Sequence, residues 1–266
     1  MTLRIYAIAY LIFLYAPIAL LPMFAFNDAT IIAFPLSGVT TEWFAALMEN
    51  ASLHAALGNS LIIAGSTAVF ATILGICAAR AGAMQDFPAK RGVTGFVMLP
   101  LVLPEIIVAV SLLVILRQVL GLNLGNWTII AAHVLICTPF SIAILNGAFG
   151  NLDPSMEEAA LDLGCTRGEA FRLVTLPLVM PGIISSLLIS FTISLDEFII
   201  AFFLTGSNPT LPVYIWGLLR FPGQLPIVMA LGTILVGLSI VLLTIAELFR
   251  RRGLARSGTK DTGGFL

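Results

Sequence analysis

Long apolar runs separated by short polar segments dominate the pattern of the chain. Six runs are long enough to cross a bilayer as helices, for which about 20 apolar residues suffice. They are Ile5–Phe26, Leu57–Ala79, Val93–Leu116, Trp127–Phe149, Val179–Thr205 and Leu225–Phe249. Because backbone in hydrocarbon must satisfy its own hydrogen bonds, the runs predict α-helices. The predicted fold class is all-α, a polytopic membrane protein of six transmembrane helices.

The composition agrees with a lipid environment. Hydrophobic residues make up 59% of the 266 residues, charged residues only 10%, and the mean hydropathy is +1.06. A typical soluble domain has about 25% charged residues. The net charge is −1, so bulk attraction to nucleic acid is excluded as a function. The expected partners therefore include the lipid bilayer and no nucleic acid.

The distribution of basic residues predicts the orientation in the membrane. With the N-terminus inside, the inner side holds eleven of the 13 Lys and Arg residues, and the outer side holds only Arg117 and Arg220. Inner loops of membrane proteins carry an excess of Lys and Arg. We therefore expect both termini, and the loop between the fourth and fifth helices, to be cytoplasmic.

That loop carries helix start and stop signals. Asp153 is a good N-cap, and Pro154 suits the first helical position, where a missing N–H costs nothing. Gly164 ends this helix, and Thr166 with Glu169 forms a capping box for the next. The pattern predicts a short helix, a glycine turn and a second helix.

The first helix of the loop is acidic and has a stretch of small residues. Glu157, Glu158 and Asp162 supply the charge, and Ala159 and Ala160 allow close approach of another backbone. One interpretation is docking into a groove of a partner protein. The alternative is an amphipathic helix that rests on lipid headgroups. The spacing alone leaves both open.

The loop resembles the EAA loop of ABC-importer permease subunits. Its residues Glu158-Ala159-Ala160, Gly164 and Val174-Thr175-Leu176-Pro177 follow that family's spacing E-A-A-x3-G-x9-I-x-L-P, with Val174 in place of isoleucine. The resemblance implies a coupling helix seated in a cleft of an ATP-hydrolysing subunit. The residues that it assigns to coupling are Glu157, Glu158, Ala159, Ala160, Asp162, Gly164 and Pro177.

The same resemblance implies the assembly around the chain. Its partners would be a dimer of ABC ATPase subunits, a second homologous permease and a periplasmic or extracellular substrate-binding protein, in a bacterial inner membrane. This chain would bind no cofactor, because ATP and Mg would be bound by the partner ATPase. The likeness covers Leu57–Glu247. We therefore expect a first helix and outer loop over residues 1–56, a type-1 permease domain over 57–249 and a basic cytoplasmic tail over 250–266.

Four acids fall within the membrane runs, and three of them lie away from the arginine-rich end of the last run. Asp196 and Glu197 lie near the middle of the fifth run, and Glu105 follows Pro104 in the third, which the prolines are expected to kink. Charge at the bilayer centre costs about 2.5–3.5 kcal/mol by insertion scales, so such acids face protein or water. They are candidates for a cation pathway; the alternative is a packing role. For His133 we expect a satisfied contact between helices.

A narrower resemblance concerns the substrate. Ser190–Phe203 and Thr210–Trp216 resemble the second permease of spermidine/putrescine importers, which carries paired acids in an S-L-D-D context; here the pair is Asp196-Glu197. The resemblance implies a polyamine or related small amine. Amino acids, γ-aminobutyrate and opines remain alternatives.

No P-loop segment G-x-x-x-x-G-K-[ST] occurs, nor H-E-x-x-H or G-x-S-x-G. We therefore expect no enzymatic activity in this chain, with ATP hydrolysis on a separate polypeptide. Two other classes stay open at this point. One is a secondary transporter that uses the acids as proton or cation sites, and the other is a membrane scaffold without a ligand.

Overall fold

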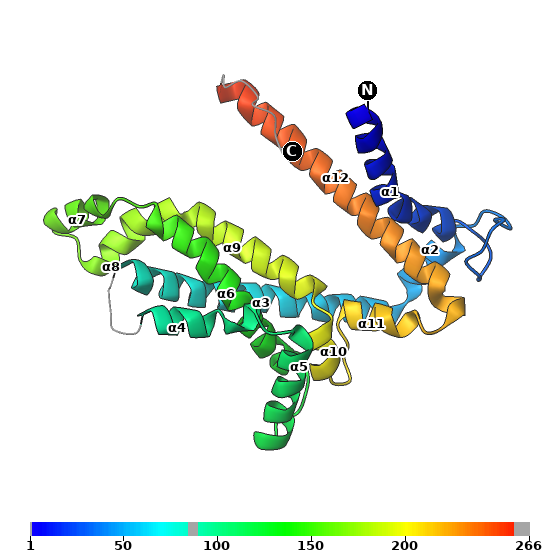
Figure 1. The fold of residues 1–266 in the computed structure, drawn as a ribbon, viewed down its shortest axis with the longest axis horizontal. Coiled ribbons are helices and arrows are strands. Elements are labelled where there is room, and N and C mark those ends of the chain that lie inside the picture. The colour runs from blue at the N-terminus through cyan, green and yellow to red at the C-terminus, as the bar shows by residue number, and fades with distance from the viewer. Residues whose placement is uncertain (1, 85–89, 258–266) are drawn as a thin grey trace. The chain divides into compact units, whose positions relative to one another are not determined.

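The computed structural model describes residues 2–84 and 90–257, in which the regular elements are helices (Figure 1). This confirms the predicted all-α fold class. Five helical stretches of the described residues are long and apolar enough to span a membrane: Leu3–Ala25, Ala51–Gly82, Asn126–Gly150, Arg167–Asp196 and Pro222–Val241. They correspond to five of the six predicted runs, so the count of six stays a prediction.

The chain divides into two compact units, of which the first comprises Met1–Ala51 and Ile215–Leu266. Its helices are α1 (Thr2–Ala25), α2 (Glu42–Glu49) and α12 (Leu225–Ser257), preceded by a 3-10 turn, η4 (Pro222–Gln224). α12 packs against both α1 and α2. Trp43 Nε1 donates a hydrogen bond to Asn27 O at 2.7 Å, which holds α2 to the chain after α1. The side chains of the predicted basic tail, and residues 258–266 entirely, lie outside the described residues.

The second unit, Ser52–Tyr214, contains the candidate sites. Its elements are α3 (Ala51–Met84), α4 (Lys90–Val97), η1 (Leu99–Leu101), α5 (Glu105–Val114), η2 (Ile115–Val119), α6 (Asn126–Gly150), α7 (Pro154–Asp162), α8 (Arg167–Ala170), η3 (Phe171–Thr175), α9 (Leu176–Asp196), α10 (Ile199–Leu204) and α11 (Leu211–Leu218). Buried side chains of α3, α5, α6 and α10 form its main core. α11 begins where the Leu211 N–H donates to Ser60 Oγ on α3 at 2.8 Å.

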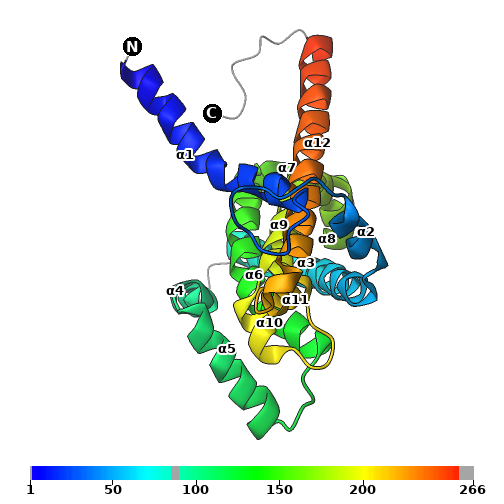
Figure 2. The same ribbon diagram turned by 90° about the vertical axis from the view of Figure 1, so that its right-hand side faces the viewer.

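A stripe of small residues on α9 seats this helix tightly on α6. Gly182, Ser186, Ser190 and Ser194 recur every fourth position and therefore share one face. A Cβ atom built on Gly182 would lie 2.5 Å from the Cβ of Ala148, closer than real contacts allow. The buried hydroxyls of Ser190 on α9 and Ser141 on α6 are hydrogen-bonded at 2.9 Å. Small residues and interhelical hydrogen bonds are the usual basis of packing in membranes, and α6 and α9 lie side by side in Figures 1 and 2.

The third predicted run is not one continuous helix, so that prediction is wrong. α4 ends at Val97, a single 3-10 turn follows, and α5 begins only at Glu105. Pro104 has an extended backbone, with φ −57° and ψ 129°. A proline inside a helix removes one hydrogen bond and clashes with the preceding turn. Pro100 and Pro104, four residues apart, therefore break this run rather than kink it. Figure 1 shows α4 and α5 running in different directions.

The fifth run is also divided, at a position the sequence did not indicate. A helical stretch is continuous from Arg167 through the π-turn η3 to Asp196, so the second helix of the loop and the membrane helix are one. Pro177 lies in the first turn of α9. The backbone is extended at Glu197 (φ −67°, ψ 123°), and α10 then starts at Ile199. The predicted single helix over Val179–Thr205 is therefore wrong in its second half.

Candidate functional site

The segment between α6 and α9 has the predicted shape. The carboxylate of Asp153 accepts a hydrogen bond from the Ser155 N–H at 3.0 Å and caps α7. At the other end, the N–H groups of Gly164 and Cys165 donate to the carbonyls of Leu161 and Ala160, at 2.9 and 3.1 Å. This is a Schellman ending, which needs a left-handed residue, and Gly164 has φ 92°. The predicted glycine turn is confirmed.

The predicted capping box is also confirmed and starts the long helix. Glu169 accepts from the Thr166 N–H at 2.8 Å, and Thr166 Oγ1 accepts from the Glu169 N–H at 3.4 Å. The hydrogen bond from the Ser155 N–H lowers the pKa of Asp153, so this cap is in its charged, accepting form at neutral pH. Each of the two carboxylates also suits the positive end of its helix.

One face of α7 is tied to the body of the unit. Glu157 pairs with Arg80 Nη2 of α3 at 3.0 Å and accepts a hydrogen bond from Thr175 Oγ1 at 2.8 Å. The Arg80 guanidinium also lies 4.0 Å from the ring centroid of Phe171. Ala160, one turn after Glu157, is buried on the same face. Through Arg80, these contacts join α3, α7 and η3.

The opposite face of α7 is exposed. Glu158, Ala159 and Asp162 are exposed, and Leu163 at its end keeps 87% of its surface accessible. Beside this helix lies a pocket of about 880 Å³, lined by residues of α3, α6, α7, Arg167 and Thr175. The seven residues assigned to coupling thus separate into three groups: Glu157 and Ala160 hold α7 in place, Gly164 and Pro177 shape the backbone, and the exposed residues are free to meet another protein.

We expect Gly164→Ala to loosen α7 because an L-residue in the left-handed region is strained by about 1–2 kcal/mol. Nothing else in the described chain crowds Gly164, so conformation alone decides the effect. Amide hydrogen exchange over residues 154–163 should accelerate in Gly164→Ala, and less in Gly164→Asn, since Asn tolerates this region better. Gly168→Ala, in α8 and equally uncrowded, is the control. Equal exchange in the Gly164→Ala and Gly168→Ala variants would contradict the assignment.

The second candidate site is the break between α9 and α10. Asp196 is the last residue of α9 and is exposed, whereas its neighbour Glu197 is buried with 7% of its surface accessible. The last four carbonyls of a helix have no partner within it, and this end of the helix dipole is negative. The end of α9 therefore combines a carboxylate with partial negative charge, which favours a cation.

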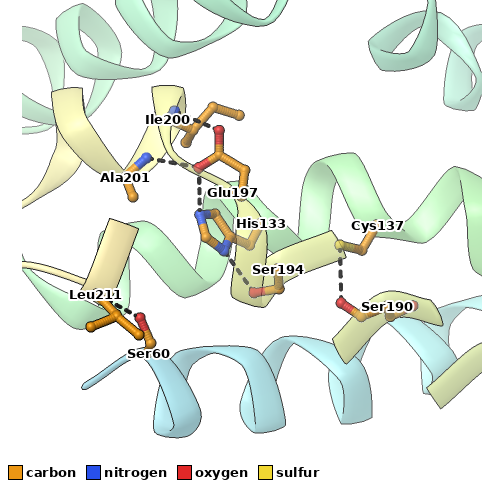
Figure 3. Close-up of polar contacts among 9 residues, drawn as sticks. All are labelled: Ser60, His133, Cys137, Ser190, Ser194, Glu197, Ile200, Ala201 and Leu211. Atoms are coloured by element: carbon orange, nitrogen blue, oxygen red, sulfur yellow. Dashed lines mark hydrogen bonds and ion pairs between the residues drawn. The ribbon is translucent and has the colours of Figure 1, made fainter. Parts of the chain in front are cut away.

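Glu197 uses its carboxylate inside the protein (Figure 3). It accepts hydrogen bonds from the N–H groups of Ile200 and Ala201, at 2.8 and 2.9 Å, and lies 3.1 Å from His133 Nε2. The other ring nitrogen of His133 is 2.7 Å from Ser194 Oγ. His133 is fully buried, which confirms the expected contact between helices. The role of Glu197 in a pathway stays a prediction.

Glu105 lies at the second break of the unit. It is the first residue of α5, directly after Pro104, and is exposed. The positive end of the α5 dipole stabilises the charge of Glu105 even without a substrate. The cation-pathway role and the packing role of this acid therefore both stay predictions. α5 packs against α10, and each of these helices starts beside one of the predicted acids. The predicted acids therefore lie at helix ends beside breaks, and not in the middle of continuous helices as the sequence suggested.

A known family of membrane proteins matches most of the chain. Residues 71–253 match the family described as binding-protein-dependent transport system inner membrane component. The chain is 36% identical over 253 residues to the spermidine/putrescine transport system permease protein PotC of Shigella flexneri, covering 95% of this chain and 93% of that one. It is 38% identical over 234 residues to the putrescine transport system permease protein PotI of Escherichia coli K12, covering 85% and 82%.

The fold is similar to a solved transporter. A bacterial ABC transporter involved in the import of the acidic polysaccharide alginate has a chain that matches with a TM-score of 0.71 at 16% identity, covering 93% of this chain and 96% of that one. At such identity the likeness concerns the fold alone.

Proposed function

Because the chain belongs to the family of binding-protein-dependent transport system inner membrane components, we propose that it carries a polyamine, or a related small amine, through its half of the translocation pathway. Membership makes the chain a membrane-embedded permease subunit of an ABC importer, in which ATP hydrolysis belongs to separate subunits. Secondary transport and a scaffold role are thereby set aside.

The exposed carboxylate of Asp196 at the negative end of α9 is the observation that carries the proposal. A protonated amine offers N–H donors and a positive charge, and charge-assisted hydrogen bonds to a carboxylate are roughly twice as strong as neutral ones. The last carbonyls of a helix are acceptors for the same group. The rings of Phe198 and Phe202 lie nearby, with centroids 5.5 Å apart and planes tilted by 39°, and aromatic faces attract cations. We assign Glu105 and Glu197 to the same pathway. Glu197 is buried, so its role is to hold the backbone at the break and not to contact the substrate.

The assembly proposed around the chain follows the arrangement of α7. Its exposed face, with Glu158, Ala159 and Asp162, is complementary to a groove on one of two ATPase subunits, which bind ATP and Mg. That contact requires α7 and both termini on the cytoplasmic side. A second, homologous permease supplies the other half of the pathway, and an outer binding protein delivers the substrate. This chain itself binds no cofactor.

Uptake of radiolabelled spermidine by proteoliposomes that contain the whole transporter tests the proposal. Asp196→Asn should lower uptake by about ten- to a hundredfold, because a hydrogen bond to a charged group is lost on the substrate side. Glu49→Gln, an exposed acid of α2 that has no assigned role, should leave uptake unchanged. If the Asp196→Asn variant transports spermidine like the unaltered protein, Asp196 is not on the pathway.

Competition identifies the substrate class within the same experiment. Unlabelled putrescine in excess should suppress spermidine uptake, whereas γ-aminobutyrate, which carries a carboxylate beside its amine, should compete weakly. Uptake of labelled γ-aminobutyrate that exceeds uptake of both polyamines would reassign the substrate to the amino-acid class.

A further inference from the structure

His133 contacts both sides of the break between α9 and α10. We propose that His133 is a positioning residue for transport: its two hydrogen bonds hold the break in the geometry that presents Asp196 to the substrate. The inference rests on the proposed role of Asp196. It assigns a function to a residue of α6 that contacts no substrate itself.

The hydrogen-bond roles follow from the partners of Glu197. Its carboxylate oxygens already accept from the N–H groups of Ile200 and Ala201, so they act as acceptors. His133 Nε2 must then carry the proton and donate to Glu197 Oε2 at 3.1 Å. In the neutral ring, Nδ1 is left as an acceptor, and Ser194 Oγ donates to it at 2.7 Å. The His133 ring therefore accepts a hydrogen bond from Ser194, before the break, and donates one to Glu197, at the break.

Glu197 depends on this donor because of its surroundings. A buried carboxylate is costly unless donors surround it. Two of its donors are the N–H groups of the second and third residues of α10, so the carboxylate also provides the helix with the cap that Phe198, at the N-cap position, does not supply. Removing the His133 donor leaves the carboxylate under-satisfied and favours a rearrangement of Glu197. The start of α10 then loses its cap.

The position of Asp196 follows from these anchors. It is preceded within two residues by Ser194 and followed directly by Glu197, and both are held by His133 on α6. Figure 3 shows the His133 ring between these two side chains. Glu197 is the extended residue that follows Asp196, so the end of α9 is free to move unless the residues around the break are fixed. The anchors therefore pre-organise the Asp196 carboxylate, which removes an entropic cost from substrate binding.

Two substitutions separate positioning from simple filling of space. The Gln amide nitrogen takes approximately the place of His Nε2, so His133→Gln keeps a donor for Glu197. The Asn side chain reaches only to the place of Nδ1, so His133→Asn keeps a partner for Ser194 and loses the donor. Ser141→Ala is the matched control, because it removes another buried α6–α9 hydrogen bond, to Ser190 at 2.9 Å, without touching the break.

The experiment uses the assembled transporter with its binding protein in proteoliposomes. Its readouts are the KM and maximal rate of spermidine uptake, and amide hydrogen exchange of the peptide that contains Ile200 and Ala201. For His133→Asn we expect exchange faster by about tenfold or more and a similar rise in KM. His133→Gln should recover most of both, and Ser141→Ala should change neither.

The outcomes are distinguishable from failure of the proposed role of Asp196, which the Asp196→Asn variant tests alone, and from failure of the proposed substrate class, which the competition experiment tests. If Asp196→Asn abolishes uptake while His133→Asn leaves KM unchanged, the positioning role is overturned and the pathway role stands. Equal losses in His133→Gln and His133→Asn also overturn it, because packing would then explain both. Unchanged exchange at residues 200 and 201 in His133→Asn overturns the capping argument directly. If Asp196→Asn transports spermidine normally, the proposed role of Asp196 fails, and the inference fails with it.

Discussion

Replacing Arg80 by glutamate should uncouple ATP hydrolysis from transport. The substitution sets two carboxylates against each other where Glu157 now pairs with the guanidinium at 3.0 Å, and it removes the cation above Phe171. About one fifth of each paired side chain remains exposed, so solvent screens part of the loss, and we expect a cost of about 1–3 kcal/mol. α7 should detach from α3. Substrate-dependent stimulation of ATP hydrolysis should then fall, while basal hydrolysis by the ATPase subunits persists.

The reversed pair provides the critical comparison. Arg80→Glu combined with Glu157→Arg restores opposite charges, although Thr175 Oγ1 loses its carboxylate acceptor, so partial recovery of coupling is expected. Arg172→Glu is the control, because it reverses an exposed charge in η3. If the double variant couples no better than Arg80→Glu alone, attraction between these two residues does not hold the helix.

Gly182→Leu should lower the thermal stability of the transporter more than the replacement of an uncrowded glycine. The Cβ of any side chain at this position would fall 2.5 Å from the Cβ of Ala148, and both atoms belong to packed helices. Overpacking of this kind costs about 1–3 kcal/mol when the backbone has to shift. The melting temperature, followed by intrinsic fluorescence of the purified complex, should fall clearly for Gly182→Leu and less for Gly182→Ala.

Gly147→Leu tests whether position matters more than the change of residue. Gly147 also lies in a long helix, α6, but a Cβ there meets nothing within 4 Å in the described part of the chain. Its melting temperature should stay close to that of the unaltered protein. Equal destabilisation at both positions would show that helix propensity or lipid contact, and not the α6–α9 contact, causes the loss.

The local signals of the loop predicted its structure well. Asp153, Pro154, Gly164 and the Thr166–Glu169 pair each act on backbone groups within a few residues, so their effect is readable from sequence, and each was found in its predicted role. Membrane runs were predicted equally well where they contain no break. Hydropathy, however, measures only average polarity, and an apolar run with an internal break has the same average as a continuous helix.

Contacts between distant segments were not predictable in this way. Arg80 is a lone charge at the end of an apolar run, and nothing in the sequence pairs it with Glu157, 77 residues away. Two acids next to each other at 196 and 197 looked equivalent, yet the break turns one outward and buries the other. A usable signal was present in α9, since a small residue at every fourth position from Gly182 to Ser194 indicates a close helix contact.

The unbroken helical stretch from Arg167 to Asp196 has a mechanical consequence. Its 30 residues correspond to about 45 Å of helix at 1.5 Å per residue. Because no loop interrupts it, a tilt of a few degrees imposed at the end beside α7 and carried along the stretch displaces the far end by several ångströms. In the proposed importer, the ATPase would then need to move α7 only slightly to reorient Asp196, without any intervening loop that could absorb the movement.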